Sequence, residues 1–157
     1  MSGASEIPEI EGFKLHARVA AGGQGEVWYA DDLGTGRAVA VKLLRAHLAT
    51  SPAFHLRFQA EVQAIAQLSH PHVVRLVDYG ITGHGPGGLR PYLVMEWARA
   101  ALHERAPRSF AEARTALAAI LSALAHAHAR GILHCDVKPS NVLLVGGDHD
   151  DVAKLSD

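Results

Sequence analysis

The sequence has a single cysteine and almost no net charge, and each of these shortages excludes a class of protein. Cys135 alone cannot form an internal disulfide, which fits a reducing compartment and predicts a cytoplasmic protein. Lys and Arg together number 15 against 16 for Asp and Glu. No excess of positive charge therefore favours nucleic acid or an acidic membrane surface as a partner.

The sequence also lacks a long apolar segment. Residues 1–13 have neither the basic nor the apolar region of a signal peptide. The longest apolar-rich run, residues 116–129, is mostly alanine, contains Ser122, His126 and His128, and is too short to span a bilayer. With 157 residues, 48% of them hydrophobic and 20% charged, the chain predicts a globular protein without a direct membrane segment.

The first part of the chain is rich in strand patterns. They occur at residues 13–19, 26–30, 37–43, 73–79 and 92–95, with glycine-containing turns or loops between several of them. Ser51 and Pro52 predict the start of a helix. One apolar stripe at helical spacing follows them: Phe54, Phe58, Val62, Ile65 and Leu68. The order predicts a five-stranded antiparallel sheet with one helix inserted after the third strand.

The second part is predicted to be mainly helical. Residues 99–105 indicate a linker with a short helix, and hence a boundary between two lobes. Ser109 and Glu112 have the spacing of a capping box, and Gly131 is expected to end the long helix that follows. The apolar face of this helix is predicted to hold Leu117, Ile120, Leu121, Leu124 and His128. A sheet with one inserted helix, followed by a helical segment, belongs to the α+β class.

A polar loop lies within the apolar stretch 132–144. Two short buried strands are expected to bracket it and to hold its carboxylate, amine and amide at one edge of a cleft. Asp136 can accept a proton, Lys138 can neutralise a phosphate, and Asn141 can coordinate a metal ion. A strand at 152–156 leads to a further carboxylate, Asp157.

The polar loop resembles the catalytic loop H-x-D-x-K-P-x-N of eukaryotic-like protein kinases, and other motifs follow in the family's order. Val39-Ala40-Val41-Lys42 resembles the V-A-x-K strand, and the glycine turn before Val27 resembles G-x-G-x-x-G-x-V. The lysine of D-x-K-P-x-N is typical of the serine/threonine kinases, here of the bacterial type. The resemblance implies an N-terminal tail (1–9), a kinase N-lobe (10–96), and a hinge with an incomplete, mainly helical C-lobe (97–157). It also implies phosphoryl transfer from ATP, with Mg²⁺, to serine or threonine hydroxyls of a protein substrate.

The resemblance also assigns roles to individual residues that bind the nucleotide. In the glycine loop these are Ala20, Gly22, Gly23 and Gly25, where Ala20 replaces the family's first glycine. Lys42 is expected to contact the α- and β-phosphates and to pair with Glu61 on the inserted helix. The adenine ring would lie between Val19, Val27, Ala40 and Leu143. Met95 would control the back pocket, and Glu96 and Ala98 would offer hinge main-chain groups.

Within the loop itself, the resemblance makes Asp136 the catalytic base and Lys138 the residue that offsets charge on the transferred phosphoryl group. Asn141 and Asp157 would hold magnesium. His134 would support the loop's main chain. Cys135 stands where the family usually has arginine, which suggests that phosphorylation of an activation loop is not the main switch; we expect Cys135 to be a small buried hydrophobe.

Two other classes of function stay open at this point. One is a non-catalytic, pseudokinase-like ATP-binding or scaffold module, which Ala20 favours and which intact Lys42 and Asp136 oppose. The other is a small-molecule phosphotransferase with a kinase-like fold. Because the sequence stops before any activation segment, we expect the isolated chain to be weakly active or inactive. The leucines of the long helix are then expected to be under-covered and prone to association.

Overall fold

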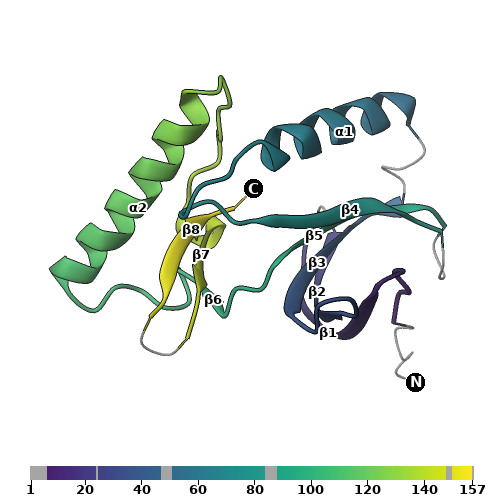
Figure 1. The fold of residues 1–157 in the computed structure, drawn as a ribbon, viewed down its shortest axis with the longest axis horizontal. Coiled ribbons are helices and arrows are strands. Elements are labelled where there is room, and N and C mark those ends of the chain that lie inside the picture. Colours follow the sequence, from purple (N-terminus) through teal and green to yellow (C-terminus); the bar gives the residue numbers. More distant parts are fainter. Residues whose placement is uncertain (1–6, 24, 47–50, 84–87, 148–149, 157) are drawn as a thin grey trace. The chain divides into compact units, whose positions relative to one another are not determined.

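The computed structural model describes residues 7–23, 25–46, 51–83, 88–147 and 150–156, and it divides into two compact units. The first unit comprises Met1–Gln63 and Leu76–Trp97, and the second comprises Ala64–Arg75 and Ala98–Asp157. The ribbon in Figure 1 shows the five-stranded sheet with helix α1 and, separately, helix α2 with a smaller sheet. The two units are defined by contacts within the chain, whereas the limits 10–96 and 97–157 refer to the lobes of a kinase and stay a prediction.

The first unit is built on an antiparallel sheet with strand order β1-β2-β3-β5-β4. Its strands are β1 (Phe13–Ala21), β2 (Gly25–Asp32), β3 (Ala38–Leu44), β4 (Leu76–Thr82) and β5 (Arg90–Glu96). Helix α1 (Pro52–Ala66) follows β3 and begins where Ser51 and Pro52 predict it. The Phe54 main-chain N–H donates to Ser51 Oγ over 3.4 Å, which satisfies one of the free N–H groups of the first turn.

Alternation of side chains gives this sheet two different faces, because successive residues of a strand point to opposite sides. One face carries the main core of the unit: Ile10, Leu15, Trp28, Ala30, Val39, Val41, Leu43 and Val94. On the other face lie the intervening residues of β3, Ala40 and Lys42. A second apolar cluster, in which Phe58 and Val62 of α1 pack with Leu93, holds the helix to the sheet.

The second unit combines a three-stranded sheet with α2 (Phe110–His128). The sheet has the order β6 (Ala100–Ala101), β7 (Val142–Val145) and β8 (Val152–Leu155), with a single 3-10 turn at Pro139–Asn141 before β7. Its buried core is formed by Val73, Ala123, Val142 and Leu155. Among the described residues, no helix is both long enough and apolar enough to cross a membrane.

Both ends of α2 are capped as the sequence predicts, with one difference. Glu112 N–H donates to Ser109 Oγ over 3.1 Å, but the Glu112 carboxylate returns to the N–H of Arg108, at 2.7 Å, rather than to Ser109. At the other end Gly131 has φ +72°, and Ile132 N–H reaches the Ala127 carbonyl over 3.0 Å. This is the Schellman arrangement, in which glycine avoids the cost of a left-handed conformation.

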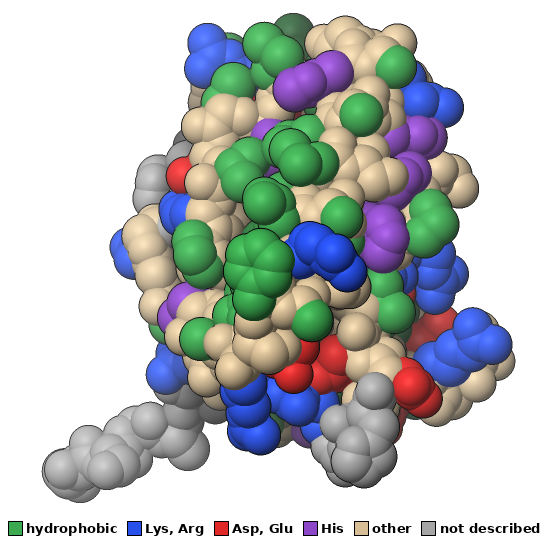
Figure 2. Space-filling model, turned by 90° about the vertical axis from the view of Figure 1, so that its left-hand side faces the viewer, with side chains coloured by type: hydrophobic (Ala, Val, Ile, Leu, Met, Phe, Trp, Pro, Cys, Tyr) green, Lys and Arg blue, Asp and Glu red, His purple; other side chains and the backbone are tan. Residues whose placement is uncertain are grey.

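The apolar face of α2 differs from the prediction. The residues fully buried against the unit are Ala119, Ala123 and Ala127, and Ile120 and Leu124 of the predicted face pack partly buried against the same core. His128 is exposed, and Leu117 and Leu121 are 56% and 57% exposed, which agrees with the expectation that these leucines are under-covered. Small alanine side chains let the helix lie close to the strands. Figure 2 shows hydrophobic side chains gathered on the face of the molecule that includes α2.

Three local predictions were wrong. The strand predicted at 73–79 begins only at Leu76, because Val73 instead forms a bridge with Leu155 in the second unit. Residues 99–105 form the short strand β6 and a turn rather than a helix. Residues 132–133 form no strand, and Leu133 is 71% exposed, so the polar loop is bracketed by a regular strand on one side only.

Candidate active site

The glycine loop joins β1 to β2 in the first unit and has one position that tolerates no side chain. Gly25 has φ +156°, and a Cβ there would lie 2.2 Å from the Leu43 carbonyl oxygen. At Gly22 and Gly23 an added Cβ would meet nothing within 4 Å. The loop is closed by Gly22 N–H donating to the Gly25 carbonyl, at 2.8 Å, and Arg45 Nη2 donates to the Gly22 carbonyl, at 3.2 Å.

Strand register brings several predicted nucleotide residues onto one face of the sheet. Val27 of β2 pairs with Lys42 of β3, which in turn pairs with Leu93 of β5. In the next row Ala40 pairs with Met95. Because paired residues share a face, these side chains form two adjoining rows across three strands. They are half-buried apart from Leu93, which is buried.

Helix α1 packs on that same face, since Leu93 contacts Phe58 and Val62 in one apolar cluster. Glu61 lies between these two positions in the sequence of α1 and is exposed. The predicted partners Lys42 and Glu61 therefore lie on β3 and α1. These two elements are linked through Leu93, which pairs with Lys42 and packs against α1.

The remaining predicted nucleotide residues are spread over both units. Val19 and Ala20 lie on β1, where Ala20 pairs with Val27, and Val19 is 50% exposed. Glu96 ends β5, whereas Ala98 and Leu143 belong to the second unit, Leu143 on β7.

The polar loop in the second unit is held by hydrogen bonds made by Asn141. Its Nδ2 donates to the Asp136 main-chain carbonyl at 2.9 Å and to Asp136 Oδ2 at 3.1 Å. Lys138 Nζ donates to the same carboxylate oxygen over 2.7 Å. Three side chains predicted to act together are thus brought together, around the carboxylate of Asp136.

His134 ties the loop to Ser156, which follows β8, and its contacts indicate the tautomer of the ring. Its Nδ1 accepts the Asp136 main-chain N–H over 3.2 Å, so the neutral ring carries its proton on Nε2. That Nε2 donates to the Ser156 carbonyl over 2.8 Å. The Asn141 carbonyl accepts from Ser156 N–H at 2.8 Å and from Ser156 Oγ at 3.3 Å. Support of the loop's main chain by His134, expected from the sequence, is confirmed.

The Asp136 carboxylate is biased towards its ionised form. The hydrogen bond and charge of Lys138 lower the pKa of Asp136, with further lowering from the Asn141 hydrogen bond and from His134. Both partners of the Lys138–Asp136 pair are at least half exposed. An exposed pair of this kind is weak, so Lys138 can leave Asp136 for another anion.

Cys135 corrects one prediction, because it is exposed rather than buried. Its φ of +61° makes it, within the described ranges, the one non-glycine residue in the left-handed region. That turn of the main chain separates His134 from Asp136 and sends the cysteine side chain outwards. The predicted metal ligand Asp157 lies outside the described residues.

The donor set of the loop fits a divalent cation at Asn141. Asn141 is buried, and its amide nitrogen is engaged by two oxygens of Asp136. Its Oδ1 is therefore the side-chain atom left to ligate a cation, and amide oxygen is a ligand that Mg²⁺ accepts. In the first unit, open space over Gly22 and Gly23 fits the approach of a phosphate to main-chain N–H groups.

The sequence did not indicate several residues that support the site through hydrogen bonds and an ion pair. Arg45 and Ser156 contact site residues, and Arg90 clamps the neighbouring strands, with Nε 2.9 Å from the Leu44 carbonyl and Nη1 2.7 Å from Glu26 Oε1. These contacts join residues up to 64 positions apart and have no local sequence signal.

The family model of the protein kinase domain matches residues 13–157. The chain is 40% identical over 149 residues to serine/threonine-protein kinase PknB of Mycobacterium tuberculosis, covering 92% of this chain and 22% of PknB. It is 38% identical over 137 residues to PknA of the same organism, covering 84% of this chain and 32% of PknA. Among solved structures, the M. tuberculosis PknI kinase domain superposes with a TM-score of 0.74 at 27% identity, covering 99% of this chain and 62% of that chain.

The chain therefore belongs to the protein kinase domain family, and its relatives include bacterial serine/threonine kinases. The predicted fold, a kinase-like antiparallel five-stranded lobe with one helix followed by a partial helical lobe, is confirmed. The chain spans about a fifth of the length of PknB and 62% of the PknI kinase domain with which it aligns.

Proposed function

We propose that this chain carries the nucleotide-binding and catalytic-loop part of a serine/threonine protein kinase, which transfers a phosphoryl group from ATP to a protein hydroxyl. The observation that carries the proposal is the hydrogen-bonded set Asp136, Lys138 and Asn141. A carboxylate, an amine and an amide converge there in the order D-x-K-x-x-N that the chemistry of phosphoryl transfer uses.

In the proposed reaction Asp136 orients the substrate hydroxyl and accepts its proton. The lowered pKa of Asp136 keeps the carboxylate ionised and ready to accept at neutral pH. Lys138, released from its exposed pair with Asp136, offsets negative charge on the group in transfer. Asn141 and Asp157 would hold Mg²⁺, which neutralises charge on the phosphates when it is bound.

The first unit supports the nucleotide part of the proposal. The glycine loop of Gly22, Gly23 and Gly25 would bind phosphate through main-chain N–H groups, for which the Gly22 N–H would have to leave the Gly25 carbonyl. Lys42 lies in the row of residues next to the row that contains Ala40 and Met95. We assign phosphate contact to the loop and Lys42, with Glu61 as the partner of Lys42. We assign the two faces of the adenine ring to Val19, Val27, Ala40 and Leu143, and we keep Ala20 in the glycine loop. We assign control of the back pocket to Met95 and the hinge main-chain contacts to Glu96 and Ala98. Location in the cytoplasm stays a prediction.

The test separates binding from transfer. ATP binding, with and without Mg²⁺, is measured by titration calorimetry, and transfer is followed with γ-labelled ATP and a serine- and threonine-rich protein. Lys42→Met is expected to weaken binding, whereas the matched control Lys14→Met, an exposed lysine of β1, leaves it unchanged. Asp136→Asn is expected to keep binding and to lower transfer by about 10²- to 10⁴-fold, the usual contribution of a general base.

Two results would count against the proposal. Because the isolated chain is expected to be weakly active or inactive, transfer is also measured with this chain joined to an activation segment and the remaining helices of a kinase C-lobe. Magnesium-dependent ATP binding without any transfer by that longer protein would identify a non-catalytic nucleotide-binding module instead. Absence of ATP binding by the folded chain, or transfer that Asp136→Asn leaves intact, would overturn the roles given to these residues.

A further inference from the structure

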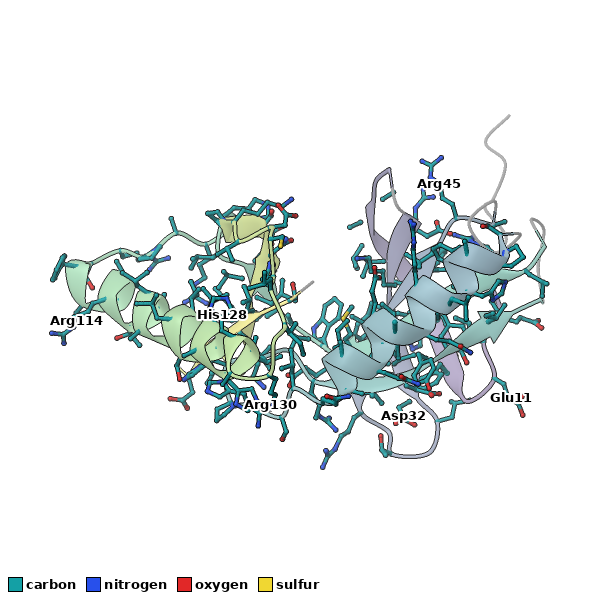
Figure 3. The ribbon with its side chains drawn as sticks, turned by 90° about the horizontal axis from the view of Figure 1, so that it is seen from above. Glu11, Asp32, Arg45, Arg114, His128 and Arg130 are labelled. Carbon is teal, nitrogen blue, oxygen red and sulfur yellow. The ribbon has the colours of Figure 1, made fainter. Side chains whose placement is uncertain are left out.

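A group of histidines lies where the segment after α1 meets α2, away from the residues assigned above. The rings of His70 and His126 have centroids 4.9 Å apart, and those of His70 and His72 are 5.7 Å apart. All three belong to the second unit. Arg130, which Figure 3 shows beyond the end of α2, completes the group.

The contacts of His70 require its neutral form. Nδ1 of His70 accepts the main-chain N–H of His72 over 3.0 Å, so the ring proton must be on Nε2. That Nε2 lies 3.1 Å from Ser122 Oγ of α2 and donates to it. A second proton on His70 would sit on Nδ1, opposite the N–H of His72, and would break this hydrogen bond.

The contacts of His126 require its neutral form for the same reason. Arg130 Nη1 lies 3.2 Å from His126 Nδ1, and because a guanidinium only donates, this nitrogen must accept. The proton is then on Nε2, which is buried and lacks a hydrogen-bond partner within the described part of the chain. Protonation of Nδ1 would place two hydrogen-bond donors, this nitrogen and Arg130 Nη1, opposite each other. It would also bring a positively charged ring next to the positively charged guanidinium.

The segment that His70 holds is bound in turn to β8. Leu155 N–H donates to the His72 carbonyl at 2.8 Å, and Val74 N–H donates to the Leu155 carbonyl at 2.9 Å. His72 Nδ1 also lies 3.0 Å from the Ala153 carbonyl. Leu155 is followed directly by Ser156, which is hydrogen-bonded to Asn141.

We propose that His70 and His126 form a protonation-sensitive contact that positions the end of β8 for the catalytic loop. At neutral pH the two uncharged rings hold the 70–74 segment on α2, and this segment holds Leu155. In acid the contact opens, and the end of β8 loses one of its two supports. His70 and His126 are positioning residues in this scheme, because neither contacts the reacting groups.

The electrostatic surroundings of the pair favour this response. The titratable and charged groups that face it are His72 from the same segment, His126 from α2, and Arg130 beyond α2. Over the described ranges, no carboxylate is hydrogen-bonded or ion-paired to either ring. Partial burial lowers the pKa of His70, and the neighbouring His126, His72 and Arg130 lower it further.

The lowered pKa of His70 sets the direction in which stability changes with pH. The folded chain holds fewer protons on His70 than the unfolded chain does, so unfolding takes up protons. The stabilisation is complete above the ordinary histidine pKa of 6.5 and is lost as the pH falls through the lower pKa of the folded state.

The experiment measures amide hydrogen exchange at Leu155 and Val74 between pH 7.5 and 5.5, corrected for the intrinsic pH dependence of exchange. In the unmodified chain we expect protection of these two amides to fall at least roughly fivefold, the lower end of common coupling between sites. His70→Asn keeps an acceptor for the N–H of His72 but does not titrate. In this variant we therefore expect the protection of the Leu155 and Val74 amides to be the same across this pH range.

A matched control is His128→Asn, an exposed histidine of the same helix, labelled in Figure 3, which should behave as the unmodified chain does. If His70→Asn fails to fold, the nitrogen chemical shifts of His70 and His126 in the unmodified chain decide instead. Neutral rings with the proton on Nε2 at pH 7.5, and loss of protection that tracks their titration, support the inference. Protection that is constant with pH, or that falls equally in His70→Asn, overturns it.

This inference rests on the proposed function in one respect: the end of β8 matters for activity because the proposed metal ligand Asp157 follows it in the sequence. The exchange and shift measurements use no nucleotide. A chain that fails to bind ATP would therefore leave the histidine contact to be judged on these measurements alone.

Discussion

The two units arrange their site residues by different means. In the first unit, position comes from strand register: Val27, Lys42 and Leu93 form one row because their strands pair in that way. In the second unit, position comes from particular side chains, since Asn141 and His134 hold an irregular segment by bonds to its main chain. A row set by register survives many side-chain changes, whereas a loop set by side chains depends on the identity of each one.

The largest expected effect on stability is at Gly25, the position of the first unit that depends most on the identity of one residue. Gly25→Val places a branched side chain against the Leu43 carbonyl and forces a left-handed conformation. We expect a loss of about 3 kcal/mol in the free energy of unfolding, at the upper end of ordinary substitutions. Urea denaturation measures it. Gly23→Ala, where an added Cβ meets nothing within 4 Å, is the control and should change little. Equal effects would show that the loop is not held as described.

The close packing of α2 in the second unit gives the next largest effect. Ala123 is fully buried, so Ala123→Leu should overpack the helix against Val142 and Leu155 and cost about 2 kcal/mol. Ala125→Leu, at an exposed position of the same helix, is the matched control. Thermal unfolding of both variants compares them. A stable Ala123→Leu would mean that α2 does not lie close to Val142 and Leu155 at this position.

Loss of the cap of α2 should have a smaller effect. Ser109→Ala removes the acceptor for Glu112 N–H and should cost about 1 kcal/mol, and Ser109→Asp should restore most of this. Chemical denaturation with helix content followed by circular dichroism is the measurement. Failure of aspartate to restore stability would show that the hydroxyl acts in another way.

The smallest expected change in stability concerns the exposed leucines. Replacing both Leu117 and Leu121 with glutamine should alter unfolding by less than about 0.5 kcal/mol, as is usual for surface positions. The same change should lower self-association, because large exposed apolar patches promote contact between molecules. Sedimentation at increasing concentration measures this. Marked destabilisation would place these side chains in the core.

The contrast between the units also explains what could be predicted from the sequence. Strand alternation and the Ser51-Pro52 start are local signals, and they located the sheet and α1. The glycine, lysine and polar-loop motifs identified the family because phosphoryl transfer fixes both residue types and spacing. The roles of the individual site residues stay predictions.

What could not be predicted arises from contacts between distant segments. The apolar pattern of Val73 fits a strand, but Leu155 captures it through a bridge 82 positions away along the chain. Leu117 and Leu121 carry more apolar surface than the alanines of α2, so a hydrophobicity pattern groups them with Ile120 and Leu124, which do pack on the core. Close approach of the helix instead buries the alanines most deeply. The outward turn at Cys135 depends on the ring of His134, which accepts from the main-chain N–H of Asp136 and donates to the distant carbonyl of Ser156.

The bonds between Ser156 and the catalytic loop have a consequence for rate. Because Asn141 and His134 both contact Ser156, the loop around Asp136 and the segment at the end of β8 cannot move independently. The loss of conformational freedom needed to bring these two segments together takes place when the chain folds, not when a substrate arrives. Substrate binding is thus spared the entropic cost of ordering this loop.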